Sequence, residues 1–115
     1  MRLEIPYPPS ANRMWRAVRG RTILSKQGRE YYDGATALAA QRCGETMLGP
    51  LSVTLMVTPP DRRRRDLDNT LKPILDLGTK AGIWGDDSQV VEIHATKARE
   101  PVKGGSVIME VTEVE

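Results

Sequence analysis

Two aspartates and an asparagine stand close together in the segment DRRRRDLDN, at Asp66, Asp68 and Asn69. Carboxylates at this spacing can converge on one hard divalent cation, because Mg²⁺ binds carboxylate oxygens together with water and substrate phosphate. The same residue types also occur at helix starts, where they cap the first turn or balance the helix dipole. The pair by itself therefore leaves two interpretations open, a metal site and a helix cap.

A second acidic pair, Asp86 and Asp87, lies in a turn that also contains Gly82, Gly85 and Ser88. Taken alone, such a pair is typical of a solvated turn. If the intervening helix and loop return the chain to the sheet, Asp87 meets Asp66 and Asp68 in space. Three carboxylates without histidine or cysteine favour Mg²⁺ or Mn²⁺ over zinc.

Four consecutive arginines directly precede Asp66, and residues 10–24 add further arginines and one tryptophan. Neighbouring cations repel one another, so such a run is best tolerated where it faces a polyanion, and the planar guanidinium suits phosphate. A solubilising loop or a sink for nearby acidic groups is the alternative. A tryptophan among arginines can stack on a base. The residues expected to contact nucleic acid are Arg62, Arg63, Arg64, Arg65, Arg13, Arg16, Arg19, Arg21 and Trp15.

Lys72 follows Asp68 by one helical turn. It could contact a scissile phosphate or an attacking water, or it could pair with Asp68 or Asp76. Trp84 is expected to anchor the core or an interface, and His94, in mid-strand, is expected to be structural.

Charge is divided unevenly along the chain. Residues 1–65 hold 12 Lys or Arg against 5 Asp or Glu, whereas residues 66–115 hold 5 against 10. A basic surface beside an acidic cluster suits a metal-dependent enzyme that acts on a polyanion, although ordinary solvated charge would look the same. One cysteine and one histidine make a structural zinc site, a Cys/His nucleophile or a disulfide poor propositions. Without a signal-like or membrane-spanning stretch, we expect a cytoplasmic protein.

Hydrophobic periodicity predicts the elements that must position these residues. Ser25 is the expected N-cap of a first helix that ends at Gly44 or Gly49. Its expected inward face holds Tyr31, Ala35, Leu38 and Arg42, with Ala39 beside them. A second helix is expected from about residue 69 to Gly82, with Pro73 in its first turn. It should turn Leu71, Ile74, Leu75 and Gly78 inward. Alternation predicts strands at residues 2–7, 51–58, 90–97 and 107–111, and residues 10–24 an exposed loop or a hairpin around Gly20.

The order strand, helix, strand, helix, strand, strand indicates an α/β or α+β fold. We expect a single domain over residues 1–115, with a small mixed sheet of about four strands and two packed helices.

The stretch RRRRDLDNTLKPILDLGTKAGIWGDDSQV resembles the RusA family of Holliday-junction resolvases. The opening PYPPSANRMWRAVRGRTILS and the turn from Lys97 to Gly105 are also similar to that family, so the resemblance spans nearly the whole chain. The combined pattern DLDN…K…DDxQV is far more specific than a lone pair of aspartates.

The resemblance implies that Asp66, Asp68 and Asp87 are the metal-binding catalytic carboxylates. It also implies that Lys72 is an essential lysine and that Arg65 serves DNA binding or catalysis. The implied activity is that of a Mg²⁺- or Mn²⁺-dependent endodeoxyribonuclease, a hydrolase that resolves four-way junctions by paired nicks in DNA recombination and repair. A RusA-like fold, a homodimer, branched DNA as partner, no membrane association and a phage or prophage origin would follow.

Asp86 also matches a family aspartate, but no catalytic role is assigned to it. Two departures from the family pattern are Trp15, where other members can carry tyrosine, and Pro73 after the lysine. Other functions remain compatible with the residues alone. They are a non-catalytic branched-DNA-binding dimer, a metal-dependent nuclease for flaps or forks, and a small protein–protein adaptor.

Overall fold

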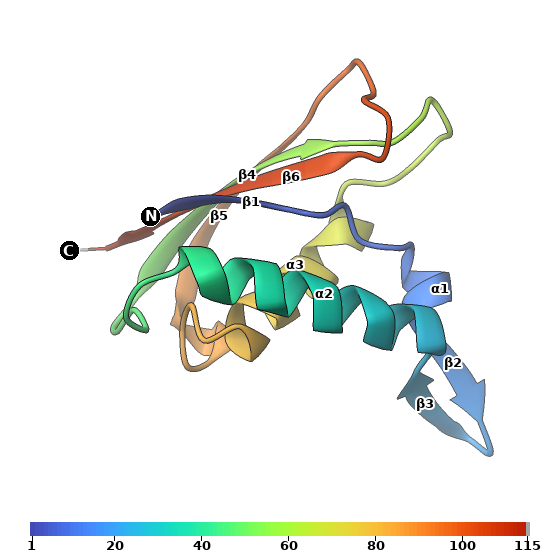
Figure 1. The fold of residues 1–115 in the computed structure, drawn as a ribbon, viewed down its shortest axis with the longest axis horizontal. Helices are drawn as coiled ribbons and strands as arrows, with labels where there is room; N and C mark the ends of the chain where they lie inside the picture. Colours follow the sequence, from blue (N-terminus) through green and yellow to red (C-terminus); the bar gives the residue numbers. More distant parts are fainter. Residues whose placement is uncertain (115) are drawn as a thin grey trace.

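A four-stranded sheet carries two long helices on one of its faces, as Figure 1 shows for the computed structural model of the chain. The structure describes residues 1–114. In chain order the elements are β1 (Arg2–Ile5), α1 (Ala11–Met14), β2 (Trp15–Val18), β3 (Arg21–Leu24), α2 (Lys26–Arg42), β4 (Leu51–Thr58), α3 (Asp68–Lys80), the 3-10 turn η1 (Asp87–Gln89), β5 (Val90–Lys97) and β6 (Ser106–Glu113).

The sheet is mixed, with strand order β1-β6-β4-β5. β4 runs parallel to β5 and antiparallel to β6, which in turn pairs antiparallel with β1. The expected α+β fold with a mixed sheet of four strands and two packed helices is therefore confirmed. No helix within residues 1–114 is both long and apolar enough to cross a bilayer.

Alternation along the strands places one face of the sheet in the core. Leu51, Val53, Leu55 and Val57 of β4 are buried, while Thr54 and Met56 between them are exposed. Since successive side chains of a strand point to opposite faces, the helices cover the first set and solvent the second.

The inward face of α2 contains Ala35 and Ala39 as expected, but Tyr32 is buried in place of Tyr31. Its buried residues include Gly28, Tyr32, Ala35 and Ala39, whereas Tyr31 is only half-buried and its hydroxyl donates to the carbonyl of Pro6 (2.8 Å). The reason is a close approach, because a Cβ at Gly28 would lie 2.4 Å from the backbone oxygen of Met14. Contact with α1 thus sets the rotation of α2.

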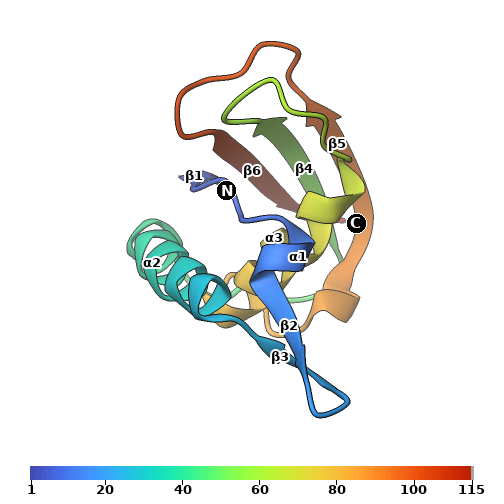
Figure 2. The same cartoon turned by 90° about the vertical axis from the view of Figure 1, so that its right-hand side faces the viewer.

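Residues 15–24 form a separate two-stranded ribbon, β2–β3, which confirms the hairpin expected around Gly20. Arg19 (φ 49°) and Gly20 (φ 75°) both adopt left-handed backbone, as a two-residue type I′ turn requires. Ser25 joins this ribbon to α2 as the predicted N-cap, since its hydroxyl accepts from the backbone N–H of Gly28 (2.9 Å). The ribbon projects away from the sheet in both views (Figures 1 and 2).

The inward face of α3 is set by Trp84. The helix buries Pro73, Ile74, Leu77 and Gly78, while Leu71 and Leu75, expected inside, are half-buried. A Cβ at Gly78 would lie 2.1 Å from the Trp84 ring, so the indole packs directly against the helix backbone. The expectation that Trp84 belongs to the core is confirmed.

Candidate functional site

Asp66 and Asp68 lie exposed at the amino end of α3. No side chain caps this helix end, where Leu67 holds the N-cap position. Neither aspartate belongs to the ion pairs found among residues 1–114. The helix-cap interpretation is therefore wrong, although Asp68 in the first turn still complements the helix dipole. Both carboxylates remain free for a ligand.

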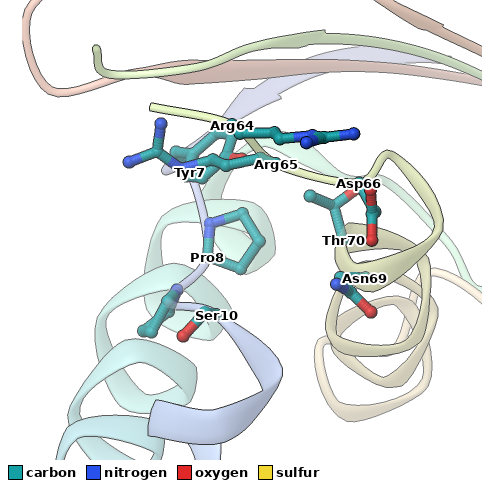
Figure 3. A pocket seen from close by; sticks show the side chains of 9 residues that line it. Tyr7, Pro8, Ser10, Arg64, Arg65, Asp66, Asn69 and Thr70 are labelled. Carbon is teal, nitrogen blue, oxygen red and sulfur yellow. The ribbon is translucent and has the colours of Figure 1, made fainter. Parts of the chain in front are cut away.

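Asp66 borders a pocket of about 410 Å³ between α3 and the loop after β1. Figure 3 shows Asn69 and Thr70 on the α3 side and Pro8 and Ser10 across from them. Arg64 and Arg65 lie along the same pocket. A phosphate held here would have guanidinium groups on one side and a carboxylate able to share a divalent cation on the other.

Arg65 is the most constrained of the four consecutive arginines. It forms an ion pair with Asp61, and its guanidinium carbon lies 6.0 Å from the centre of the Tyr7 ring. The hydrogen bond from Arg65 lowers the pKa of Asp61 to about 2. Arg65 therefore has a structural role within the arginine loop. To contact DNA as predicted, it would have to release Asp61 and Tyr7.

The other three arginines face solvent. Arg62 pairs with Glu100 at 2.6 Å, and the two side chains are 71% and 78% exposed. Arg63 lies 4.0 Å from Asp61, and Arg64 takes part in no ion pair among the described residues. The arginine loop therefore does pair with nearby acidic side chains, as the alternative interpretation of the arginine run expected. Because such exposed pairs contribute only about 0–1 kcal/mol, a phosphate can replace them.

The arginines of α1 and of the ribbon are also exposed, but they occupy two places. Arg13 lines a second pocket of about 310 Å³ together with Arg63 and Arg64. Arg19 and Arg21 lie at the tip of the ribbon. The structure therefore groups Arg13 with the arginine loop and extends Arg16, Arg19 and Arg21 into solvent.

Lys72 lies on the exposed side of α3, one turn after Asp68. Its ammonium contacts Asp76 Oδ2 (3.2 Å) and lies 5.2 Å from the centre of the Trp15 ring. Asp76 thus is the pairing partner of Lys72, and it also accepts a hydrogen bond from Tyr32 (3.3 Å). Burial and the nearby carboxylate of Asp76 raise the pKa of Tyr32, so this hydroxyl stays a donor. Sequence reasoning missed Tyr32, which no motif marks.

Asp87, the first residue of η1, lies beside the carboxyl end of α3. Its Oδ1 accepts hydrogen bonds from the indole N–H of Trp84 (3.0 Å) and from the hydroxyl of Thr79. From Asp68 to Thr79 the helix rises about 16 Å, at about 1.5 Å per residue. Within residues 1–114 no three acidic, histidine or cysteine side chains form a group able to hold a metal. The expectation that one chain brings Asp87 to Asp66 and Asp68 is therefore wrong.

Asp86 has a local structural role. Its carboxylate accepts from the backbone N–H of Ser88 (2.7 Å), and this bond lowers the pKa of Asp86. Gln89 completes the cap of η1 and donates from its amide to the carbonyls of Met47 (3.1 Å) and Gly49 (3.0 Å). Gln89 is the glutamine of the pattern DDxQV, and the capping-box spacing Asp-x-x-Gln marks its structural role, which the sequence analysis did not assign. These bonds hold the Asp87 turn against the rest of the fold.

We expect Gly78→Ala to destabilise the protein by roughly 1–3 kcal/mol, because the added methyl overlaps the buried Trp84 ring. Urea unfolding followed by circular dichroism measures the change. Gly34→Ala is the matched control, since Gly34 is an exposed glycine of α2 with open space around it. That change should stabilise the helix by about 0.5–1 kcal/mol. Equal unfolding midpoints for the two variants would contradict the packing argument.

Comparison with known proteins identifies the fold family. A family model described as endodeoxyribonuclease RusA matches residues 6–111. The chain belongs to the RusA family. Among RusA proteins, the crossover junction endodeoxyribonuclease RusA of Shigella sonnei (strain Ss046) is 42% identical over 114 residues, covering 97% of this chain and 93% of the relative. The proteins of that name from Escherichia coli (strain K12) and Enterobacteria phage 82 are each 41% identical over the same shares.

The RusA match confirms the resemblance seen in the sequence, and one of the relatives is encoded by a phage. The family relationship does not by itself assign roles to residues of this chain. The catalytic and metal-binding roles of Asp66, Asp68, Asp87 and Lys72 stay predictions.

Proposed function

We propose that this RusA protein is a Holliday-junction resolvase that makes paired, Mg²⁺- or Mn²⁺-dependent nicks in four-way DNA junctions. The observation that carries the proposal is its identity of 41–42%, over 97% of the chain, to relatives named crossover junction endodeoxyribonucleases. Asp66 and Asp68 neither cap the helix nor form an ion pair within residues 1–114, and this supports metal-dependent cleavage. Because such a substrate is chromosomal or phage DNA, we expect the protein to act in the cytoplasm.

The donor set at the amino end of α3 fits a hard divalent cation. Asp66 and Asp68 would hold it, because both carboxylates are exposed and neither pairs with another side chain within residues 1–114. A divalent ion bound there would activate water and stabilise charge at phosphorus. Arg64, at the rim of the same pocket, would bind the neighbouring phosphate, and Lys72 would contribute positive charge beside the reacting group.

Exposed arginines would supply most of the affinity for DNA. For the double variant Arg63→Gln/Arg64→Gln, we expect the slope of log K against log salt to fall by about 1.8, at about 0.9 per lost contact with B-DNA. Fluorescence anisotropy with a labelled junction in EDTA measures it. Arg42→Gln is the control, because Arg42 lies in the last turn of α2 and bonds the carbonyl of Glu4. A slope unchanged from wild type in the double variant would exclude the arginine loop from the interface.

Two nicks placed symmetrically across a junction require two sites related by a two-fold axis. One chain supplies one set of the predicted site residues. A homodimer supplies the second set in the correct symmetry relation, so we propose a dimer as the active form.

The test compares labelled four-way junction, replication fork, flap and linear duplex, each with Mg²⁺ and with excess EDTA. We expect symmetry-related nicks in the junction only, and only with the metal. Equal cutting of forks or flaps would identify a nuclease of different specificity. Tight junction binding without cutting would leave a DNA-binding dimer.

A further inference from the structure

The ammonium of Lys72 occupies a place that the energetics of the helix do not favour. It lies 3.2 Å from Asp76 Oδ2, and the two side chains are 70% and 26% exposed. A lysine four residues before an aspartate is the weaker orientation of this ion pair, because cations are disfavoured near the amino end of a helix. Exposed ion pairs of this kind seldom fix a lysine in one conformation. A defined position for the ammonium therefore depends on how firmly Asp76 itself is held.

Tyr32 holds Asp76 from the neighbouring helix. Its side chain belongs to the core, with 5% of the residue exposed, and its hydroxyl donates to Asp76 Oδ2 (3.3 Å). The same oxygen accepts from Lys72. Because burial and the Asp76 carboxylate raise the pKa of this phenol, the proton needed for the bond stays on Tyr32. An aromatic side chain packed in the core thus fixes the carboxylate that contacts the lysine.

Trp15 borders the same ammonium from a third element. The centre of its ring lies 5.2 Å from Lys72 Nζ, within the range of cation–π attraction. Trp15 begins β2 and packs half-buried against the core, so its ring is not free to follow the lysine. Side chains of α2, α3 and β2 therefore converge on one exposed ammonium.

We propose that Tyr32 is a positioning residue, whose hydroxyl fixes the Asp76 carboxylate and thereby sets the place of the Lys72 ammonium one turn after Asp68. The role of that place in cleavage rests on the proposed function, which takes Lys72 as the charge beside the reacting phosphate. A misplacement of about 1 Å at such a group costs up to about 10²-fold in rate, although no charge is lost. Tyr32 itself touches no substrate and acts only through Asp76 and Lys72.

Removal of one oxygen tests this role. Tyr32→Phe keeps the buried ring, and we expect single-turnover cleavage of a four-way junction to slow about 10-fold, less than for loss of the lysine itself. The dissociation constant of the junction in EDTA should stay as in wild type. Tyr31→Phe is the matched control, because the hydroxyl of Tyr31 donates to the carbonyl of Pro6 (2.8 Å), away from Lys72. Equal cleavage rates for the two phenylalanine variants would overturn the proposal.

A double variant separates positioning from a merely structural role. If Tyr32 acts through Lys72, its hydroxyl has nothing to position once the ammonium is absent. Tyr32→Phe/Lys72→Met should then cut at the rate of Lys72→Met alone, because the two changes interrupt one pathway. A structural effect of Tyr32 on the site would slow the double variant by a further factor equal to that of Tyr32→Phe, and this additivity would overturn the proposal.

The position of Lys72 can also be measured without any cleavage. In protein labelled with ¹³C at lysine Cε, the ring current of Trp15 displaces the methylene signal of Lys72 in a proton–carbon correlation spectrum, and Lys72→Met identifies that signal. We expect Tyr32→Phe to move the signal toward the value of a free lysine, and Tyr31→Phe to leave it in place. An unchanged signal in Tyr32→Phe would overturn the proposal.

These measurements distinguish failure of the inference from failure of the proposed function. If wild type cuts no junction but Tyr32→Phe displaces the Lys72 signal, the positioning of the ammonium stands and the resolvase proposal alone fails. If wild type cuts junctions and Tyr32→Phe changes neither the rate nor the signal, the resolvase proposal stands and the positioning role of Tyr32 is rejected.

Discussion

Asp68→Asn should leave a protein that binds a four-way junction and no longer cuts it. The side chain is exposed, caps nothing and belongs to no ion pair in residues 1–114, so the amide should not disturb the fold. Loss of one anionic metal ligand removes several kcal/mol of transition-state stabilisation, which corresponds to a rate at least about 10³-fold lower. Single-turnover cleavage at saturating protein gives the rate, and anisotropy in EDTA gives the dissociation constant.

Asp33→Asn is the control for this change, because Asp33 is an exposed carboxylate of α2 that no site includes. It should cut and bind as wild type does. A cleavage rate for Asp68→Asn within tenfold of wild type would remove Asp68 from the chemistry. Loss of junction binding together with cutting would show that the carboxylate supports the DNA interface instead.

Lys72→Met should lower the cleavage rate by roughly 10²-fold, the scale expected when one electrostatic donor at a developing charge is removed. Lys72 lies one turn after Asp68 on the same side of α3, and Asp76 and Trp15 hold its ammonium in place. Mn²⁺ binding should be unchanged, because the lysine is not a metal ligand. The same single-turnover assay, with electron paramagnetic resonance of Mn²⁺, measures both quantities.

Lys80→Met is the matched control, since Lys80 is an exposed lysine in the last turn of the same helix. It should retain nearly the full rate. Lys72→Arg keeps the charge and should recover part of the lost activity. Equal rates for Lys72→Met and Lys80→Met would reject a special role for Lys72.

Most of the fold could be predicted from local pattern. The alternation of β4, the N-cap at Ser25 and the hairpin at Gly20 depend on neighbours in sequence, and the structure confirms all three. The helix faces could be predicted only in part. Periodicity placed Ala35 and Ala39 of α2 and Ile74 and Gly78 of α3 inside, as the structure does. Gly28 packs against Met14 and Gly78 against Trp84, and these contacts between elements, which periodicity does not show, set the rest of each buried face.

The candidate site was predictable in its residues but not in its assembly. Spacing alone left Asp66 and Asp68 between a cap and a ligand site. The structure argues only against the cap, because Leu67 holds the N-cap position of α3 and no side chain caps it. The separation of Asp87 was contained in the sequence. A helix from about residue 69 to Gly82 spans nearly 20 Å at about 1.5 Å per residue, too far for a shared ion. For Asp87 to meet Asp66 and Asp68 within one chain, the chain would have to fold back to the start of α3, and it does not.

The two tryptophans of the chain stand at opposite ends of α3. The indole N–H of Trp84 bonds Asp87, and the ring of Trp15 lies under the ammonium of Lys72. Indole emission responds to nearby charge and to hydrogen bonding at the ring nitrogen. The protein therefore carries its own fluorophore at each half of the candidate site, and because the sequence has two tryptophans, its tryptophan fluorescence comes from these two positions alone. Arrival of a cation or a phosphate can be followed in the unmodified chain, without a dye.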